Sequence, residues 1–313
     1  MNKLEEIIDT CQFVTKNAKY VKIKEEEIKK LVKQLKIEKP KHWLLNNPFG
    51  LLDLDIKEIV NFLIILEAID CSFWGEPKWT IVTEEGKEID GAFALIYGLI
   101  KLQKEKGHLD FEQISFLEFK ETLKGNVTIP LLEERYEVVS EVSKIINKKM
   151  NGNFYEFTKD ITTDLELFDL IINNFPSFED TRTYNGKTIY FYKLAQLVTS
   201  DILHIKEWKE NAKVDYSHLV GCADYKIPQS LRGLNILEYD EELASLVDNK
   251  KEIEENSIYE VEIRASMIIA IDKIKQELNN TICAIDINDI IWSLGQDKTK
   301  NFKPYHRTRT MSY

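Results

Sequence analysis

Residues 130–150 read PLLEERYEVVSEVSKIINKKM, and their apolar side chains recur at the spacing of an amphipathic helix. Pro130 suits the first turn of a helix, because an N–H group at that position would have no partner inside the helix. Gly152 follows the periodic stretch and can end the helix. The apolar face comprises Leu132, Val138, Val139, Val142, Ile145 and Ile146. The stretch therefore predicts a long helix that packs one face against a core.

The same helical period recurs along most of the chain. Asp55, with Glu58 three residues later, resembles a capping box and predicts a helix over residues 55–69. Further helices are predicted over residues 24–36, 90–104, 163–174, 192–208, 240–248 and 258–279. Neither a repeat nor a linker divides the sequence, so we expect a single compact domain over residues 1–313.

Strand signals are few. A short extended segment, VKI, precedes the first of these helices, and residues 79–92 look like a hairpin around a Glu-Glu-Gly-Lys turn. Residues 183–192 contain Asn185-Gly186, the favoured two-residue hairpin turn, between β-rich arms. The expected fold class is therefore mainly α with a few short β-hairpins.

The composition describes a chain that can fill a core but cannot bind polyanions strongly. Of 313 residues, 43% are hydrophobic, and 53 Asp and Glu against 42 Lys and Arg give a net charge of −11. Because phosphate neutralisation supplies most non-specific affinity for nucleic acids, we expect no stable nucleic-acid complex. A local basic pocket for one phosphate remains compatible with this charge.

The cysteines are widely scattered and contain no Cys-x-x-Cys motif, which fits a reducing, cytoplasmic location. They are Cys11, Cys71, Cys222 and Cys283. The first residues lack the pattern of a signal peptide, and the most apolar stretch, residues 56–69, is interrupted by charges. We therefore expect neither a disulfide framework nor a membrane span.

Several familiar catalytic signatures are missing from the sequence. It contains no P-loop, no Gly-x-Gly-x-x-Gly, no His-Glu-x-x-His and no Gly-x-Ser-x-Gly motif. The five histidines also lack the spacing of metal ligands. P-loop nucleotide hydrolysis, dinucleotide redox chemistry, zincin proteolysis and the usual esterase chemistry therefore lose support, and neither a metal nor another cofactor is predicted.

Polar and aromatic clusters remain, and each has a structural and a functional interpretation. In Asp-Cys-Ser-Phe-Trp at 70–74, Phe73 and Trp74 could stack on a planar heterocycle or plug the core. The first-turn acids Glu133 and Glu134 suit the helix dipole without any further role. Lys193 follows a strand and opens a helix, so it could reach a phosphate or lie on the surface.

Three further clusters lie in the second half of the chain. Asp224 stands in GCADYKIPQ at 221–229, where it could be a catalytic acid or only a helix N-cap. Arg264, in EVEIRA, could bind an anion or pair with a carboxylate. Residues 306–309, three of which are basic, could form a docked segment or a disordered tail.

Together, and in this order, these segments resemble the queuosine-salvage family, the queuosine 5′-phosphate N-glycosylases. The matching segments are SFW at 72–74, PLLEER at 130–135, FYKLAQ at 191–196, ADYKIPQ at 223–229, VEIR at 261–264, and PYHRTR at 304–309 with Tyr313. The resemblance implies a mainly helical fold related to helix-hairpin-helix DNA glycosylases. It also implies an enzyme that hydrolyses the N-glycosidic bond of queuosine 5′-phosphate and releases queuine for salvage of this tRNA modification.

The resemblance also implies which residues form the site. Asp224 is the expected catalytic carboxylate, because a fixed negative charge near the anomeric carbon stabilises an oxocarbenium-like state or activates water. The expected partners of the phosphate are Lys193, Arg264, His306 and Arg307. Other substrate contacts are expected from His42, Phe73, Trp74, Cys222, Ala223, Tyr225, Asp289 and Ser293.

The chain departs from the family pattern at two places. Cys222 precedes Ala-Asp-Tyr where an aromatic residue is usual, and the stretch NDIIWS at 288–293 lacks or shifts one acid. These departures leave open a nucleosidase for another modified base. A non-catalytic queuine-binding protein and a helical scaffold protein are the alternatives from other classes.

Overall fold

The computed structural model describes residues 2–34 and 39–313. Within this part of the chain the helices are α1 (Lys3–Asn17), α2 (Glu25–Gln34), α3 (Ile56–Glu67), α4 (Gly91–Lys106), α5 (Phe116–Thr122), α6 (Leu132–Met150), α7 (Phe154–Thr158), α8 (Asp164–Asn174), α9 (Lys193–Glu210), α10 (Lys226–Gly233), α11 (Glu241–Asp248), α12 (Ile258–Glu277) and α13 (Ala284–Gln296). Short 3-10 helices are η1 (Trp43–Asn46), η2 (Pro48–Asp53), η3 (Pro176–Phe178) and η4 (Lys298–Lys300).

Over residues 2–34 and 39–313, the strands form three two-stranded antiparallel sheets. The strands are β1 (Val21–Ile23), β2 (Thr80–Val82), β3 (Glu88–Asp90), β4 (Thr181–Tyr184), β5 (Lys187–Tyr190) and β6 (Leu237–Tyr239). Two of the sheets, β2–β3 and β4–β5, are the predicted hairpins, and Asn185 and Gly186 both have the positive φ that their tight turn requires. The third sheet pairs β1 with the distant β6. The mainly α class with short β pairs is confirmed.

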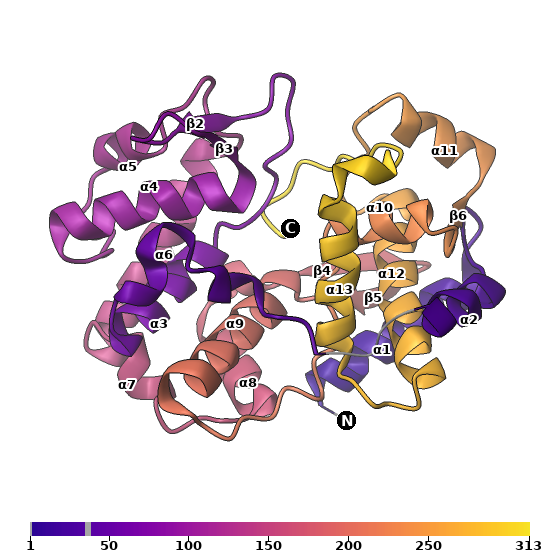
Figure 1. The fold of residues 1–313 in the computed structure, drawn as a ribbon, viewed down its shortest axis with the longest axis horizontal. Helices are drawn as coiled ribbons and strands as arrows, with labels where there is room; N and C mark the ends of the chain where they lie inside the picture. Colours follow the sequence, from indigo (N-terminus) through magenta and orange to yellow (C-terminus); the bar gives the residue numbers. More distant parts are fainter. Residues whose placement is uncertain (1, 35–38) are drawn as a thin grey trace.

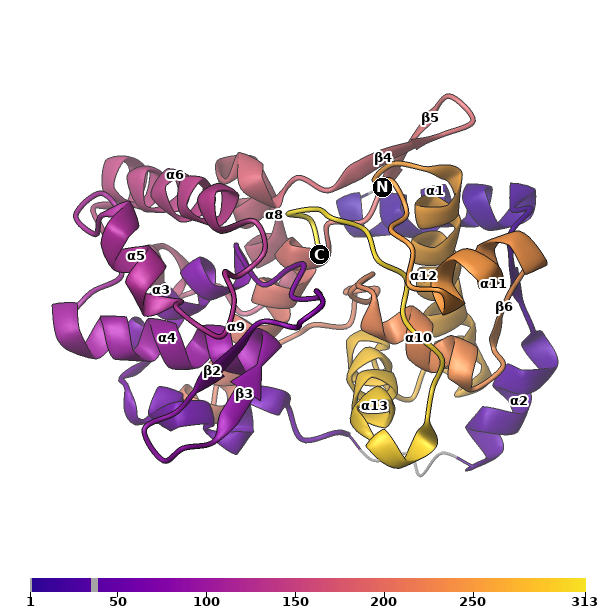
Figure 2. The ribbon, with the colours of Figure 1, turned by 90° about the horizontal axis from the view of Figure 1, so that it is seen from above.

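The helices form two groups on either side of the middle of the molecule (Figure 1). One group contains α3 to α9, where α9 packs on both α3 and α8. The other contains α1, α2 and α10 to α13, with α12 packed on α1, α2 and α13. The view from above shows the same division, and in both views the end marked C lies between the groups (Figure 2).

Helix α6 confirms the long amphipathic helix and corrects its buried face. The helix begins at Leu132, after Leu131 in the left-handed region (φ 58°), and ends before Asn151. Its buried face includes Arg135, which the apolar pattern does not predict. The Arg135 guanidinium donates to the carbonyl oxygens of Pro130 (2.8 Å), Cys71 (2.5 Å) and Ile69. This arginine therefore fixes the backbone that follows α3.

Helix α12 is the most enclosed helix of the second group, and it carries buried charges. The Glu262 carboxylate accepts the backbone N–H groups of Lys19, Tyr20 and Val21 at 2.7–3.1 Å. It also accepts the hydroxyl of Tyr184 at 2.8 Å. This acid thereby holds the turn between α1 and β1, and its burial needs no catalytic explanation.

Residues 304–313 are docked and connect the two groups of helices. The N–H of Ile253 donates to the carbonyl oxygen of Arg307 at 2.7 Å in the second group. On the first group, the backbone N–H of Ser72 donates to the Tyr313 carbonyl at 3.0 Å. The hydroxyl of Ser72 donates to the Thr310 carbonyl at 2.7 Å. Of the two interpretations of this basic segment, the docked one is confirmed.

The sequence predictions missed some elements and set some boundaries slightly off. The helices α1, α5, α7, α10 and α13 were not predicted from periodicity. The predicted helix 24–36 corresponds to α2, and its last two positions lie outside the described residues. Among the described residues, no helix combines the length and apolar character that crossing a bilayer requires.

Candidate functional site

A cavity of about 240 Å³ lies between the two groups of helices. Its walls come from the segment after α3, the start of α4, the first two turns of α9, the start of α10, one face of α13 and Tyr313. Seven of the predicted site residues line it. They are Phe73, Lys193, Cys222, Asp224, Tyr225, Asp289 and Ser293.

Asp224 binds the start of α10 and also lines the cavity. One carboxylate oxygen, Oδ1, accepts the backbone N–H groups of Lys226 (2.9 Å) and Ile227 (2.8 Å) at the start of α10. Its other oxygen, Oδ2, makes no hydrogen bond with a described residue, and the side chain lines the cavity. Burial raises the pKa of Asp224, although Lys193 opposes this shift. The carboxylate is thus fixed by one oxygen and free at the other.

The backbone before Asp224 is held by side chains from other helices. Gln196 on α9 accepts the N–H of Val220 (2.9 Å) and donates to the carbonyl of Gly221 (3.0 Å). Asn288 on α13 accepts the N–H of Cys222 at 3.0 Å. Gly221 has φ +117°, which a residue with a side chain rarely adopts. These contacts fix the position of residues 220–223 and therefore of Asp224.

Lys193 lies at the first position of α9 and is nearly fully buried. Its ammonium donates to the carbonyl oxygen of Asp70 (3.0 Å) and pairs with the Asp70 carboxylate (3.3 Å). Burial lowers the pKa of Lys193, but the carboxylates of Asp70 and Asp224 outweigh burial and hold it above its ordinary value. A permanent cation therefore stands close to Asp224.

One face of α13 supplies another wall. Asp289, Trp292 and Ser293 follow the i, i+3, i+4 spacing and line the cavity together. Burial raises the pKa of Asp289 to about 6, with His42 opposing the shift. Asn288 donates to Asp289 at 3.3 Å. This wall carries an acid that can titrate near neutral pH.

Aromatic rings surround the cavity. Phe73 stacks on Trp79 with ring centroids 6.2 Å apart, and the Arg135 guanidinium lies 5.0 Å from its ring. Trp43 and Phe93, which the sequence analysis did not select, line the cavity edge to face at 6.1 Å. Trp43 follows His42 in the sequence. Its position next to that selected residue was the sequence signal that could have led to Trp43.

Arg264 lies behind the cavity and does not line it. Its guanidinium binds both oxygens of Asp180 (2.9 and 2.6 Å) and lies 3.5 Å from Glu260. It is also 4.1 Å from the ring centroids of both Phe191 and Tyr313. Its Nε donates to the carbonyl oxygen of Ala223 at 2.9 Å. The residue therefore pairs with a carboxylate, the second of its two sequence interpretations, and positions the backbone before Asp224.

His306 lies outside the lining as well. It is buried beside Tyr313, whose hydroxyl lies 3.4 Å from its Nε2. Burial and the nearby Arg264 lower the pKa of His306 to about 3, so its imidazole is neutral at pH 7. A neutral, enclosed imidazole is a poor partner for a phosphate.

The remaining predicted residues also lie outside the lining. Ala223 contributes its carbonyl to Arg264. Arg307 pairs with Glu76 at 2.7 Å, and Trp74 packs under the guanidinium of Arg309 at 3.5 Å.

His42 is the last of the predicted residues that do not line the cavity. It is buried, pairs with Asp201 at 3.1 Å and stacks on His204 at 4.2 Å. The same Asp201 oxygen accepts the indole N–H of Trp43 at 3.3 Å. His42 thus packs behind the Trp43 wall.

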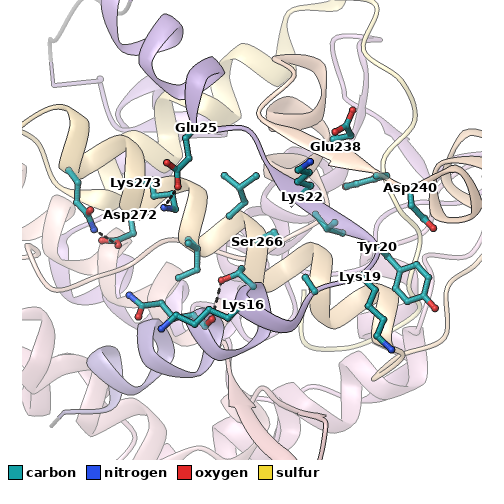
Figure 3. A pocket seen from close by; sticks show the side chains of 18 of the residues that line it. Lys16, Lys19, Tyr20, Lys22, Glu25, Glu238, Asp240, Ser266, Asp272 and Lys273 are labelled. Carbon is teal, nitrogen blue, oxygen red and sulfur yellow. Dashed lines mark hydrogen bonds and ion pairs between the residues drawn. The ribbon is translucent and has the colours of Figure 1, made fainter.

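A larger groove, of about 770 Å³, lies between α1, β1, α2, β6 and α12 (Figure 3). Its charged side chains have both signs, and Lys273 pairs with Glu25 at 2.6 Å. Asp272 likewise accepts from Gln276 at 2.7 Å. None of the predicted site residues lines this groove.

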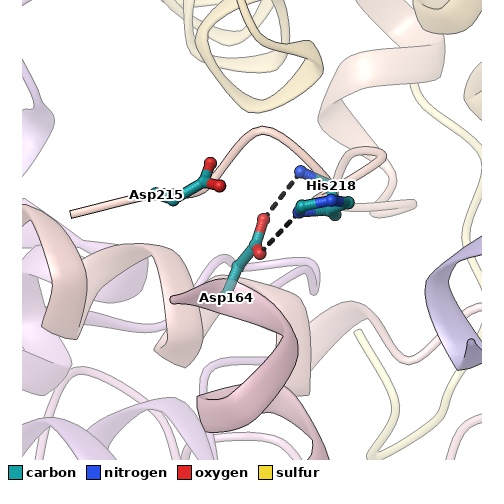
Figure 4. A group of neighbouring side chains, drawn as sticks. All are labelled: Asp164, Asp215 and His218. Atoms are coloured by element: carbon teal, nitrogen blue, oxygen red, sulfur yellow. Dashed lines mark hydrogen bonds and ion pairs between the residues drawn. The ribbon is translucent and has the colours of Figure 1, made fainter. Parts of the chain in front are cut away.

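Asp164, Asp215 and His218 lie close together beside α8 (Figure 4). The buried Asp164 carboxylate accepts the N–H groups of His218 (2.7 Å) and Leu219 (3.1 Å) and lies 3.0 Å from the His218 imidazole. Its hydrogen-bonding capacity is used in holding the loop that leads to Gly221. The cluster is accounted for without a ligand.

Comparisons with known proteins identify the family of this chain. The family model described as queuosine salvage protein matches residues 52–313. A protein of Sphaerobacter thermophilus named queuosine 5′-phosphate N-glycosylase/hydrolase is 33% identical over 266 residues, which cover 82% of this chain and 81% of that protein. Proteins of the same name from Dictyostelium discoideum and Mus musculus are 26% and 25% identical, and each match covers at least 97% of both chains. The chain therefore belongs to the queuosine salvage protein family.

Proposed function

We propose that this protein hydrolyses the N-glycosidic bond of queuosine 5′-phosphate and releases queuine. The observation that carries the proposal is Asp224, which lines the cavity with one oxygen bound to the start of α10 and the other free. The names of the relatives, queuosine 5′-phosphate N-glycosylase/hydrolase, support the same reaction.

Asp224 acts on the sugar. Breaking the bond builds positive charge on the anomeric carbon, and a preoriented carboxylate stabilises that charge without reorganising. The same oxygen can accept a proton from the attacking water, and a pKa raised by burial makes it a better base. Because the Lys226 and Ile227 N–H groups hold Oδ1, the free Oδ2 keeps one orientation through the reaction.

The leaving base determines what the rest of the cavity must do. Queuine is a 7-deazaguanine and has no N7 to protonate, so the protein must hold the departing ring by stacking and by hydrogen bonds to its other polar atoms. Trp43, Phe93 and Trp292 supply flat apolar walls. Asp289 can pair with the cationic amine of the base's side chain. The side chain of Cys222 is smaller than the aromatic side chain usual at this position. The queuine ring therefore stacks on Trp43, Phe93 and Trp292 and not on residue 222.

The wider expectations belong to the same proposal. We propose that residues 1–313 form one domain and that the fold is related to helix-hairpin-helix DNA glycosylases. An acid at a cavity between two groups of helices supports this relationship. The four cysteines are free, and the net charge is −11, which supports a cytoplasmic enzyme that acts on a small nucleotide without a stable nucleic-acid complex.

The test is release of queuine from queuosine 5′-phosphate, followed by chromatography, for the wild type and Asp224→Asn. The variant should lose about 10²- to 10⁴-fold in kcat, the range for one general base or electrostatic group. Asp9→Asn, an exposed change on α1, is the control and should leave the rate unchanged.

Three outcomes would contradict the proposal. Turnover by Asp224→Asn at the wild-type rate would remove Asp224 from the chemistry. Equal release of base from guanosine monophosphate would indicate a nucleosidase of broader range. Tight binding of queuine without any turnover by the wild type would indicate a binding protein.

A further inference from the structure

Glu67 is a buried acid to which the proposed reaction assigns no role. It lies at the last position of α3 and is 0% exposed. Neither of its carboxyl oxygens has a hydrogen-bond donor among residues 2–34 and 39–313. A buried carboxylate without a donor is strongly disfavoured, because nothing replaces the water that would solvate its charge. The surroundings of Glu67 therefore favour the neutral acid.

Asp201 on α9 is the neighbour that can accept a proton from Glu67. It is also fully buried, and its Oδ1 already takes two N–H groups, from His42 (3.1 Å) and Trp43 (3.3 Å). Its Oδ2 has no donor within the described part of the chain. The side chains of Glu67 and Asp201 lie within hydrogen-bonding reach of each other. Two ionised carboxylates would repel here, whereas a proton on Glu67 lets it donate to Asp201 Oδ2.

The proton belongs on Glu67 and the negative charge on Asp201. Asp201 has two N–H donors that stabilise its charge, whereas Glu67 has none in the described ranges. Burial and the charges of Asp201 and Asp70 raise the pKa of Glu67 well above its ordinary value. Lys193 opposes this shift, but its ammonium already binds the carboxylate and carbonyl oxygens of Asp70. The arrangement is thus a neutral acid beside a carboxylate.

Asp201 connects this proton to the wall of the cavity. Trp43 lines the cavity, and its indole N–H donates to Asp201. A carboxylate with both oxygens bound keeps one orientation, and the indole that it accepts from keeps one orientation with it. Without the donor on Glu67, the Asp201 carboxylate can turn about its last torsion, which has broad preferences, and the Trp43 ring is held less firmly.

Resting on the proposed function, we propose that Glu67 is a positioning residue that donates a proton to Asp201 Oδ2 and thereby fixes Trp43 as a wall for the base. Glu67 itself does not line the cavity, so it acts through Asp201. A ring that is already ordered in the free enzyme spares the substrate the cost of ordering it. The contact serves binding of the base before and during bond cleavage, so its loss should raise KM and change kcat little.

The first test asks whether Glu67 carries the proton. An infrared difference spectrum between the wild type and Glu67→Gln at pH 7 should show the carbonyl band of a protonated carboxyl group that the variant lacks. Asp9→Asn, the exposed change on α1, is the control and should show no such band. Absence of the band in the Glu67→Gln difference spectrum overturns the inference. This measurement needs no turnover, so it leaves the proposed function intact.

The second test measures KM and kcat for release of queuine. Glu67→Gln places an amide donor at the same position and should keep the wild-type KM. Glu67→Leu should raise KM about 3- to 10-fold, the range for one hydrogen bond, with kcat little changed. Trp43→Phe keeps an aromatic wall and removes the indole N–H. In that background, Glu67→Leu should therefore raise KM no further.

Thermal denaturation first shows which variants are folded. An equal rise of KM in Glu67→Gln and Glu67→Leu overturns the inference, and so does a double variant in which the effects of Glu67→Leu and Trp43→Phe simply add. If Glu67→Leu does not fold, the infrared band and the KM of Glu67→Gln still decide. Failure of the wild type to release queuine overturns the proposed function, whereas the infrared spectrum still shows whether Glu67 is protonated, so the two failures are distinguishable.

Discussion

Replacing Arg264 with methionine removes a cation from a fully enclosed group of charges. Arg264 is 0% exposed, and its partners Asp180 and Glu260 are 2% and 0% exposed. Breaking a buried ion pair by removing one partner costs about 3–5 kcal/mol, because a charge is left uncompensated. Arg182 still contacts Asp180 at 3.4 Å and Glu260 at 3.0 Å, so we expect the lower end, about 3 kcal/mol.

This cost converts into a measurable shift of the melting temperature. An unfolding entropy of about 2.1 cal/mol/K per residue gives about 0.7 kcal/mol/K for 313 residues, so 3 kcal/mol lowers Tm by about 5 °C. The Ala223 carbonyl also loses its donor, which displaces the backbone next to Asp224. A small displacement of a catalytic group is costly, so kcat should fall by about 10- to 100-fold well below Tm.

The assay is thermal denaturation followed by circular dichroism, with turnover measured at 20 °C below the variant's Tm. Lys273→Met on the same helix α12 is the matched control, because its pair with Glu25 is exposed and worth at most about 1 kcal/mol. The pKa of Asp180 lies below its ordinary value despite burial, because of Arg264. Its stabilisation is therefore present above about pH 4 and lost at lower pH, so the variant should differ from the wild type most at neutral pH. A Tm within 1 °C of the wild type would refute this reasoning.

Two other carboxyl groups give predictions of their own. Burial raises the pKa of Asp289 to about 6, so the affinity for queuine should weaken as the pH falls from 7 to 5, because the neutral acid cannot pair with a cationic amine. Calorimetric titration of Asp289→Asn should show a flat pH profile, and a wild-type profile that is already flat would contradict the pairing. Glu67 is fully buried, and burial together with Asp201 raises its pKa well above the ordinary value, which favours the neutral acid. Glu67→Gln keeps a neutral donor and should cost less than about 1 kcal/mol in denaturant unfolding, whereas Glu67→Ala should cost several kcal/mol; equal losses would show that the acid is charged.

The sequence was sufficient to predict the longest helices, α6, α9 and α12, although it missed α1 and α13. Residues 130–150 form a helix because their apolar period is unbroken, and Asp55 with Glu58 forms the predicted capping box. The burial of Arg135 on that helix was out of reach, because two of the three carbonyl groups that bind it belong to residues more than 60 positions away. The spacing of apolar residues shows which face of a helix is apolar. It does not show which polar side chain will bind a group that is distant in the sequence.

The site divides in a similar way. Asp224, Lys193 and Asp289 could be selected because they stand in distinctive segments, and the structure places them in one cavity. Arg264 was selected for the same reason, but it binds Asp180, an acid from a distant segment. The sequence does not show that these two residues pair. Phe93 was not selected, because its place on the cavity wall beside Trp43 is visible only in three dimensions.

The docking of residues 304–313 across both groups of helices has a consequence for how the pocket arises. Its walls draw on positions from Lys41 to Tyr313, so no shorter portion of the polypeptide holds a complete binding surface. On a ribosome, the helices α3 to α9 are complete before α10 to α13 are made, and the second group must wait for those last helices to pack on α1 and α2. The complete cavity therefore forms only at the end of folding, when residues 304–313 join the two groups of helices, because neither group alone supplies all of its walls.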